Sequence, residues 1–349
     1  MDSMLICGGA GFIGSNFARL ALARTNAEVI VLDKLTYAGS LLNLADCERN
    51  SRYQFVAGDI GDRSIVDNLL HERSPRWIIN FAAETHVDRS IDGPRYFIEN
   101  NALATCSLLE SIRSYLSGSG RRDFRLLHIS TDETYGSLGP SGRFDESAPY
   151  APNSPYAASK AAADHFVRAY NHTYGVPAMI AHCSNNYGCY QYPEKLIPKT
   201  VLHAIEGRQI PVYGDGENVR DWLFVSDNCE ALLAILTKGK IGEAYNVGGG
   251  NERRNIDVVM MICRILEECL PAGLNESLAA AGKRSYQDLC AFVEDRPGHD
   301  RRYALDCAKI ERELGWRAST PLEDGLRRTI RWYLENRAWC DSVRARAAQ

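Results

Sequence analysis

Short apolar runs alternate with segments of helical periodicity along the first half of the chain. The runs contain few polar residues, which is typical of strands covered on both faces of a parallel sheet. We expect strands at residues 4–7, 28–32, 53–57, 77–81 and 126–130, and helices at 13–24, 64–71 and 98–115. Strands and helices in alternation predict an α/β fold with a Rossmann-type, doubly wound parallel sheet.

The second half of the chain is less regular. Helical periodicity recurs at 159–173 and 193–206, and apolar runs at 178–181 and 242–247. Glycine, proline and asparagine become denser from about residue 187, which indicates more turns. We therefore predict that residues 1–186 bind a dinucleotide and carry the catalytic residues. Residues 187–349 would form a smaller α/β domain that mainly holds the substrate, from which the chain could cross back to the sheet.

The composition is that of a globular protein without a bias toward nucleic acid or membranes. The chain has 349 residues and a formal net charge of −4, which offers no broad basic surface for a duplex or an anionic membrane. It contains no run of about 18 or more apolar residues, as a membrane span would require. The eleven cysteines are scattered without a C-x-x-C pair. We therefore expect reduced thiols, a cytoplasmic protein and no metal site.

A glycine-rich segment follows the first predicted strand. Gly8, Gly11 and Gly14 are spaced three residues apart and lead into the first predicted helix. Small residues let the backbone approach a pyrophosphate, which then lies at the helix N-terminus. Asp33 follows the second predicted strand, where its carboxylate would accept the adenosine ribose hydroxyls and favour NAD over NADP. Lys34 beside it weakens that preference.

Three other polar residues have structural alternatives. Asp59 follows the third predicted strand, where it would either face the adenine or cap the next helix. His128 lies within a predicted strand and is expected to be a hydrogen-bonded core histidine. His86 follows the fourth predicted strand and is expected to shape a loop.

Tyr156 and Lys160 lie four residues apart at the start of a predicted helix, so their side chains share one face. A nearby ammonium and a nicotinamide cation would stabilise the phenolate, so we expect the pKa of Tyr156 to fall toward a range useful for proton transfer. The alternative is a surface helix pair. Ser130 and Thr131 end a predicted strand at the sheet edge where open α/β folds bind ligands.

Asp132 and Glu133 follow directly at the same edge. Two carboxylates whose environments separate their pKa values can serve as one acid and one base. Elimination of water needs such a pair, because one group removes a carbon-bound proton while the other protonates the leaving hydroxyl. The alternative is a helix-capping or solvated pair.

Several long motifs make the comparison with a known family specific. They are AETHVDRS at 83–90, STDE at 130–133, CSNNYG at 183–188, YPEKLIP at 192–198 and DRPGHDRRY at 295–303, together with Tyr156 and Lys160. From the first strand to about residue 337, the chain resembles the dTDP-glucose 4,6-dehydratases, a family of extended short-chain dehydrogenases/reductases. Cys7, Asn100, Thr134 and Cys189 depart from the usual family pattern, and residues 272–289 match it weakly.

The resemblance implies a three-step reaction on one bound NAD. Tyr156, assisted by Thr131 and Lys160, would take the proton of the sugar 4-hydroxyl as hydride passes to the cofactor. Glu133 would then remove the proton on carbon 5, and Asp132 would protonate the hydroxyl leaving carbon 6. Hydride would return to carbon 6 and a proton to carbon 5, giving dTDP-4-dehydro-6-deoxy-D-glucose and regenerating NAD.

The glycine motif and the resemblance together assign a set of NAD-binding residues. They are Gly8, Gly11, Phe12, Ile13, Gly14, Asp33, Lys34, Thr36, Asp59, Ile60, Phe81, Ala82, Ala83, Thr85, Asn100, Tyr156, Lys160 and Asn186.

The resemblance likewise assigns residues to three parts of the substrate. Thr85, Thr131 and Asn185 would lie beside the sugar; Lys195, Leu196, Pro211 and Tyr213 beside the nucleoside; Arg220, Asn255, Arg296 and His299 beside the diphosphate. Arginine suits a diphosphate because it gives bidentate contacts. Asn255 could instead cap a helix, and His299 could be a structural histidine.

Two other functions remain open on the sequence. One is the same dehydration of UDP-glucose or another nucleotide hexose; the other is a non-catalytic NAD-binding sensor. UDP-glucuronate decarboxylases share the fold but would lack Asp132. The resemblance also implies a homodimer in which residues 98–115 and 159–173 of both copies form a four-helix bundle.

Overall fold

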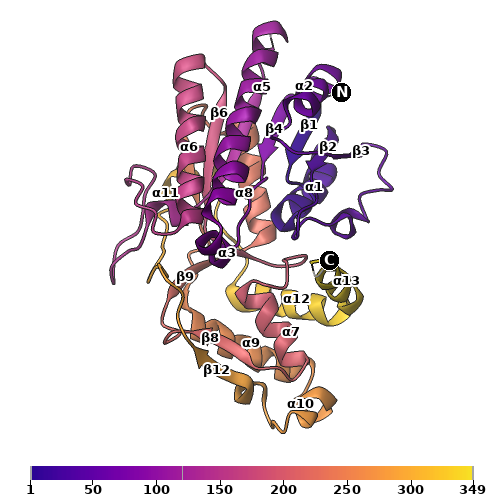
Figure 1. The fold of residues 1–349 in the computed structure, drawn as a ribbon, viewed down its shortest axis with the longest axis vertical. Helices are drawn as coiled ribbons and strands as arrows, with labels where there is room; N and C mark the ends of the chain where they lie inside the picture. Colours follow the sequence, from indigo (N-terminus) through magenta and orange to yellow (C-terminus); the bar gives the residue numbers. More distant parts are fainter. Residues whose placement is uncertain (1, 120, 348–349) are drawn as a thin grey trace.

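A seven-stranded parallel sheet forms the centre of the computed structural model, which describes residues 2–119 and 121–347 (Figure 1). The strand order is β3-β2-β1-β4-β5-β6-β10, and each neighbouring pair is parallel. The strands are β1 Ser3–Cys7, β2 Glu28–Asp33, β3 Tyr53–Ala57, β4 Trp77–Asn80, β5 Arg125–Thr131, β6 Ala178–Cys183 and β10 Ala244–Val247. The order reverses at β1, which confirms the predicted doubly wound sheet.

Helices cover both faces of this sheet. Met4 and Ile6 of β1 pack into a core with α1 (Phe12–Arg24) and α8 (Val225–Lys238). Leu5 and Cys7, the alternate residues of that strand, pack into a second core. Its helices are α2 Arg63–Arg73, α5 Ala104–Ser119 and α6 Pro155–Tyr174. Both alternate sets are buried, which explains why the strands read as continuous apolar runs.

The segment between β4 and β5 differs from the single helix expected at 98–115. Two short helices, α3 (Val87–Asp92) and α4 (Pro94–Phe97), come first. A π-helical stretch, η2 (Ile98–Leu103), then leads into α5. Periodicity alone does not distinguish a π-helical turn from an α-helical one, and π-helical turns are frequent at functional sites.

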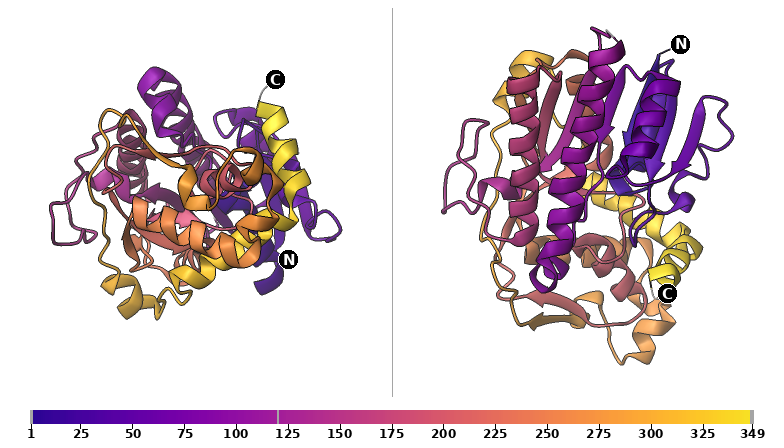
Figure 2. Two further views of the ribbon diagram at one scale, coloured as in Figure 1. Left: turned by 90° about the horizontal axis from the view of Figure 1, so that it is seen from below. Right: turned by 45° about the horizontal axis from the view of Figure 1, so that its top comes forward.

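Most of the remaining elements lie at the carboxyl end of the sheet, in the lower half of Figure 1 and in Figure 2, whereas α11 (Ala308–Leu314) packs against α8 and β10 of the large sheet. β7 (Asn185–Tyr187), β9 (Val219–Phe224) and β11 (Glu252–Arg254) form one small sheet, and β8 (Ile210–Tyr213) pairs with β12 (Cys290–Val293). The helices are α7 Leu196–Ile205, α9 Asn255–Cys269, α10 Glu276–Ala280, α11 Ala308–Leu314, α12 Leu322–Glu335 and α13 Arg337–Ala347. Short 3₁₀ turns are η1 Leu41–Leu44, η3 Asp132–Tyr135, η4 Ala272–Leu274 and η5 Tyr286–Leu289.

After β9 the chain crosses back to the large sheet. Helix α8 packs on α1, and β10 pairs with β6 at the sheet edge. The segment beyond residue 187 therefore contributes to the large sheet as well as to the small ones. Among the described residues, no helix combines the length and the apolar character needed to cross a membrane.

Candidate active site

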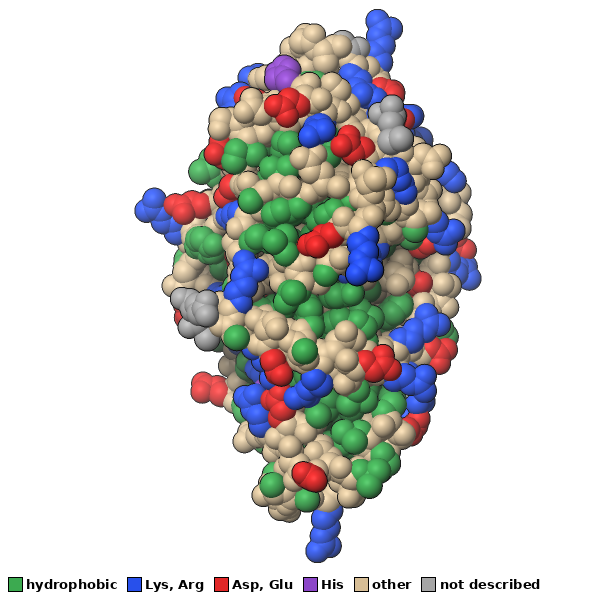
Figure 3. All heavy atoms as spheres, turned by 90° about the vertical axis from the view of Figure 1, so that its right-hand side faces the viewer, with side chains coloured by type: hydrophobic (Ala, Val, Ile, Leu, Met, Phe, Trp, Pro, Cys, Tyr) green, Lys and Arg blue, Asp and Glu red, His purple; other side chains and the backbone are tan. Residues whose placement is uncertain are grey.

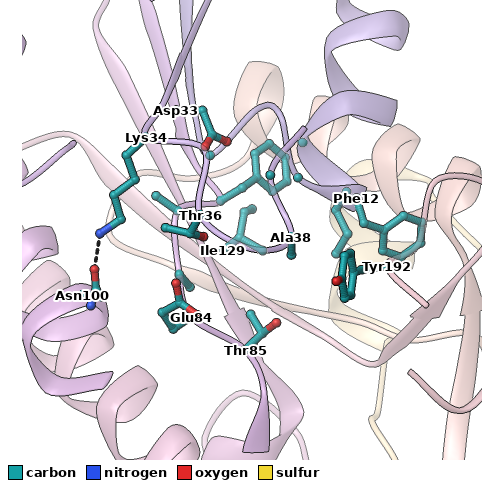
Figure 4. A pocket seen from close by; sticks show the side chains of 18 of the residues that line it. Phe12, Asp33, Lys34, Thr36, Ala38, Glu84, Thr85, Asn100, Ile129 and Tyr192 are labelled. Carbon is teal, nitrogen blue, oxygen red and sulfur yellow. Dashed lines mark hydrogen bonds between the residues drawn. The ribbon is translucent and has the colours of Figure 1, made fainter. Parts of the chain in front are cut away.

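A cavity opens at the carboxyl ends of β1, β2, β4 and β5. Every residue expected to bind NAD, except Asn186, lines it. Asn186 lies just behind, because its backbone carbonyl accepts a hydrogen bond (2.9 Å) from the side chain of Gln191, which lines the cavity. Figure 4 shows residues from β2, from the loops after β2 and β4, and from η2 around this space.

The glycine turn between β1 and α1 fits a dinucleotide pyrophosphate. Gly8 has a φ of +72°, and a Cβ there would lie 2.5 Å from the backbone nitrogen of Ala82. A Cβ on Gly14 would lie 2.4 Å from the carbonyl oxygen of Gly8. Gly11, at the N-cap of α1, has no side chain to cover the first-turn N–H groups, which can therefore face phosphate oxygens.

Asp33 and Lys34, at the ribose end of the cavity, have different hydrogen-bond partners. Asp33 accepts hydrogen bonds from the backbone N–H groups of Ala10 (2.9 Å) and Leu35 (2.7 Å), which fix its carboxylate. Lys34 reaches across to Asp59 (2.9 Å) and Asn100 (Figure 4). Its charge is thus partly neutralised, which favours the unphosphorylated ribose of NAD.

Asp59 does not cap a helix. The N-cap of α2 is Asp62, whose carboxylate accepts from Ser64 and Ile65. Asp59 instead lines the cavity and accepts from the N–H of Gly61 (2.8 Å). The helix-cap alternative is therefore wrong.

The acid pair lies in the 3₁₀ turn η3 directly after β5. Thr131 is the N-cap of this turn, and its hydroxyl accepts from the N–H of Glu133. Asp132 is only 2% exposed. Because Thr131 caps the turn and Asp132 is buried, the capping and solvated alternatives for the pair are both wrong.

The surroundings of the two acids differ in charge. Burial, and then the charges of Glu133 and Asp221, raise the pKa of Asp132 well above its ordinary value. Burial also raises the pKa of Glu133, but the cationic Arg296, Arg220 and Lys195 act against that rise. Asp132 is therefore the better proton donor and Glu133 the better base.

Tyr156 and Lys160 lie one turn apart near the N-terminus of α6, which Ser154 caps. Both are buried and both line the cavity, so the surface-pair alternative is wrong. Burial, and then the charge of Glu133, raise the pKa of Tyr156, while a hydrogen bond with Thr131 lowers it. The expected fall of this pKa is thus not seen in the protein alone, because burial and Glu133 outweigh the stabilising groups.

Behind Lys160 lies a buried polar cluster. Lys160 Nζ donates to the carbonyl of Ile129 (2.7 Å) and lies 3.5 Å from His128 Nε2. Asp164, one turn further along α6, lies 3.5 Å from His128 Nε2 and 3.3 Å from His182 Nε2, and it accepts a hydrogen bond of 2.6 Å from the hydroxyl of Ser130. Burial lowers the pKa of Lys160 to about 8, and the charge of Asp164 opposes that fall.

Arg220, Arg296 and His299 gather on the far side of the acid pair. The Arg220 side chain donates to the carbonyls of Val219 and Asp300, both at 2.8 Å. Its guanidinium lies 4.3 Å from the ring centroid of Tyr303. Arg296 lies 3.4 Å from Asp88, and its buried Nε has no hydrogen-bond partner among the described residues.

His299 and Asn255 occupy different settings beside this cluster. His299 Nδ1 lies 2.6 Å from Asp295, and the ring packs edge-on against Tyr213. Asn255 is the first residue of α9, and Arg254 is its N-cap. The helix-cap alternative for Asn255 is therefore wrong. Its Oδ1 lacks a hydrogen-bond partner within the described part of the chain.

Of the other expected substrate residues, only Thr85 and Lys195 line the cavity within the described part of the chain. Lys195 Nζ donates to the carbonyl of Thr85 (2.7 Å), and both residues line the cavity. Leu196 begins α7 directly after Lys195. Asn185 begins β7, and Pro211 lies in β8 opposite Ala291 of β12.

Asn101, in η2, is a positioning residue that the sequence did not suggest. Its amide accepts from the N–H of Glu84 (2.8 Å) and donates to the carbonyl of Glu84 (3.0 Å) and to Ser159 Oγ (2.9 Å). It thereby ties the loop after β4 to α6. The π-helical geometry that aims it is not readable from sequence periodicity. Glu84 and Glu194 also line the cavity, and both lie within motifs quoted above.

Comparisons with known proteins agree with this geometry. The family model described as GDP-mannose 4,6 dehydratase matches residues 5–329. A dTDP-glucose 4,6-dehydratase of Xanthomonas campestris pv. campestris is 53% identical over 98% of this chain and 96% of that protein. One of Salmonella typhimurium is 47% identical over 99% and 96%.

Solved structures give the same result. A dTDP-glucose 4,6-dehydratase of Streptomyces venezuelae, crystallised with NAD bound, superposes with a TM-score of 0.87 at 45% identity, covering 98% of this chain and 99% of that one. A UDP-glucose 4-epimerase of Thermotoga maritima is more distant, with a TM-score of 0.81 at 26% identity over 95% and 99%. From its sequence relatives and its structure alike, the chain belongs to the dTDP-glucose 4,6-dehydratase family.

Proposed function

We propose that this chain uses bound NAD to convert dTDP-D-glucose into dTDP-4-dehydro-6-deoxy-D-glucose. One observation carries the proposal: Asp132 and Glu133, in surroundings of different charge, directly follow Ser130, which lines the cavity together with Tyr156 and Lys160, and both acids lie close enough to Tyr156 to raise its pKa. Oxidation of an alcohol needs only the tyrosine and lysine, whereas the acid pair adds the elimination of water. The relatives named dTDP-glucose 4,6-dehydratase support this reaction.

The residues at the cavity fit NAD in its expected orientation. The glycine turn would hold the pyrophosphate, Asp33 the adenosine ribose, and Tyr156 with Lys160 the nicotinamide end. When bound, NAD accepts hydride from sugar carbon 4, returns it to carbon 6, and adds a positive charge that favours the Tyr156 phenolate.

Tyr156 takes the proton of the 4-hydroxyl, with Thr131 as its hydrogen-bond partner. The resulting ketone acidifies the hydrogen on carbon 5, which Glu133 removes. Asp132, which keeps its proton because of burial, gives that proton to the hydroxyl leaving carbon 6. Arg220 and Arg296 would hold the diphosphate, and their charges oppose the rise in the pKa of Glu133.

The sugar nucleotide would extend from the acid pair toward α7 and β8. His299 would join Arg220, Arg296 and Asn255 at the diphosphate, and Lys195, Leu196, Pro211 and Tyr213 would hold the nucleoside. Two buried atoms support this placement. Among the described residues, neither Arg296 Nε nor Asn255 Oδ1 has a hydrogen-bond partner, although buried polar atoms normally have one.

A homodimer through α5 and α6 belongs to the same proposal. Ile98 and Leu103, just before α5, are 56% and 60% exposed, and Phe166 and Tyr174 on α6 are 42% and 50% exposed. Figures 1 and 2 show these two helices side by side on one face. Large exposed apolar side chains on two adjacent helices support a bundle with a second copy. We also propose a cytoplasmic location, in keeping with eleven free thiols.

The test is turnover of dTDP-glucose, UDP-glucose and CDP-glucose in parallel, with no nicotinamide beyond what copurifies. Formation of the 4-keto sugar is followed by its absorbance in alkali. We expect a strong preference for the dTDP sugar without net consumption of NAD. Faster turnover of the UDP sugar would contradict the nucleoside assignment, and NAD binding without turnover of any of the three would favour the sensor.

A further inference from the structure

The C-terminal helix α13 lies outside the matched family model, which ends at residue 329. Figure 1 shows it below the N-terminal elements that form the adenosine side of the cavity. The face that carries it is drawn in Figure 3, where hydrophobic side chains run down the middle with charged ones around them. Cys340 and Val343 of α13 are buried, so this helix packs against the remainder of the molecule.

One contact links α13 to the glycine turn. Trp339 Nε1 donates to Asn43 Oδ1 (2.9 Å), and Asn43 Nδ2 donates to the carbonyl of Ala10 (2.8 Å). Asn43 is only 1% exposed. Ala10 lies within the turn that would bind the pyrophosphate, so Trp339 supports that turn through one intermediate side chain.

A second contact links α13 to the ribose loop, residues 34–39. Arg346 donates to the carbonyls of Leu35 (2.9 Å) and Gly39 (2.8 Å). Leu35 has a φ of +57°, a left-handed conformation that costs a non-glycine residue free energy and persists only when neighbours hold it. Lys34, Thr36 and Gly39 of this loop line the cavity.

The same arginine lies close enough to influence the ribose-binding carboxylate. Burial raises the pKa of Asp33, and the N–H groups of Leu35 and Ala10, followed by the charges of Lys34 and Arg346, oppose that rise. The Arg346 contacts therefore fix the loop beside Asp33 and add a positive charge at its edge.

Other contacts of α13 lead away from the cavity. Arg337 and Arg344 both reach Glu206, after α7, at 3.3 and 2.5 Å. The Trp339 ring packs edge-on against Trp332 and Tyr190, with ring centroids 5.0 and 5.9 Å away. These contacts dock the helix on the remainder of the molecule without touching the ribose loop.

We propose that α13 is a strap that retains NAD, with Arg346 and Trp339 as positioning residues that hold the ribose loop and the glycine turn in their binding geometry. The inference rests on the proposed use of NAD. In that reaction the cofactor is reduced and reoxidised within one turnover, so early release would leave the sugar as an unfinished ketone. A strap that slows release of the adenosine end meets this requirement.

The test measures release of NAD from the full-length enzyme. The protein is loaded with NAD, freed of excess by gel filtration, and mixed with an alcohol dehydrogenase and ethanol, which reduce any NAD that is released. We expect Arg346→Ala to release NAD about tenfold faster than the unmodified protein, a change of about 1.4 kcal/mol. Trp339→Phe keeps the aromatic ring but loses the N–H donor, and we expect release about threefold faster.

Arg344→Ala is the matched control, because it removes an arginine from the same helix, leaves both cavity contacts in place, and leaves Arg337 to hold Glu206. It should release NAD at the unmodified rate, and binding of dTDP should be unchanged in all three variants. Equal release from Arg346→Ala and the unmodified protein would overturn the proposal, as would equally fast release from Arg344→Ala. If the unmodified protein held no NAD at all, the proposed function would fail instead.

Discussion

Asp164→Asn tests how the protein keeps Lys160 charged. Asp164 lies one turn beyond Lys160 on α6, is fully buried, and carries the charge that most strongly opposes the fall in the Lys160 pKa. Asparagine has nearly the same shape and can still accept the hydrogen bond from Ser130 Oγ. The substitution therefore removes a charge with little change of volume.

The magnitude follows from two distances. Asp164 Oδ1 and Lys160 Nζ each lie 3.5 Å from His128 Nε2, so the two charges are at most about 7 Å apart. At an effective dielectric constant of about 20, that separation gives about 2.4 kcal/mol of attraction, which corresponds to about 1.7 pKa units. Because the pKa of Lys160 is already lowered to about 8, the variant's lysine would be largely neutral at pH 7.

The assay is the pH dependence of kcat for the dehydration of dTDP-glucose. The charged form of Lys160 supports the Tyr156 phenolate, so activity should fall as pH rises through the Lys160 pKa. In Asp164→Asn this basic limb should move to lower pH by about 1.7 units. An unchanged basic limb in a folded variant would refute the reasoning.

Tyr150→Phe is the control for a merely structural effect. The Tyr150 hydroxyl lies 2.7 Å from His182 Nε2, at the far side of the same cluster. Its removal alters a hydrogen bond near Asp164 but leaves the charge of Asp164 in place. The control should lose some stability against heat and keep the basic limb of the unmodified enzyme.

Three further predictions concern the acid pair, the glycine turn and the dimer. Asp132→Asn should fold normally, because asparagine has nearly the same shape and the raised pKa of Asp132 shows that its charged form is disfavoured at this site. Product formation should fall about 10²- to 10⁴-fold as the proton donor is lost; near-normal turnover would contradict the acid role. Gly14→Ala would place a Cβ 2.4 Å from the Gly8 carbonyl oxygen, so it should reduce the NAD content of the purified protein. Leu103→Asp puts a charge on a residue that is 60% exposed beside α5, and sedimentation should show more monomer if the bundle forms the dimer.

The large sheet was predictable because local and long-range signals agree in it. Strands buried on both faces read as unbroken apolar runs, and each run ends within a residue or two of the observed strand. The position of helix α8 and strand β10 in the fold could not be predicted from the sequence pattern. The apolar run at 242–247 indicates a strand, but its place beside β6 follows from the packing of α8 on α1, which depends on contacts far apart in the chain.

In the candidate site, too, some residues were predictable from the sequence and others were not. The glycine turn, Asp33 and the Tyr156–Lys160 pair were predictable because each depends on spacing within one turn or helix. The partners of Asp164 were not, since His128 comes from β5 and His182 from β6. Strand pairing, and not spacing along the chain, brings those side chains to Asp164.

The direction of the Tyr156 pKa shows why proximity in sequence is not enough. A lysine one turn away predicts a stabilised phenolate, but stabilisation depends on the sum over all neighbours and on burial. Here Glu133 adds a negative charge next to the same phenol, which is itself buried. The positive charge of a bound nicotinamide would act in the opposite direction, so the pKa of Tyr156 would respond to occupancy of the site. The acid proposed to remove the carbon 5 proton thus also raises the pKa of Tyr156, so one charge would act on both the oxidation and the elimination step.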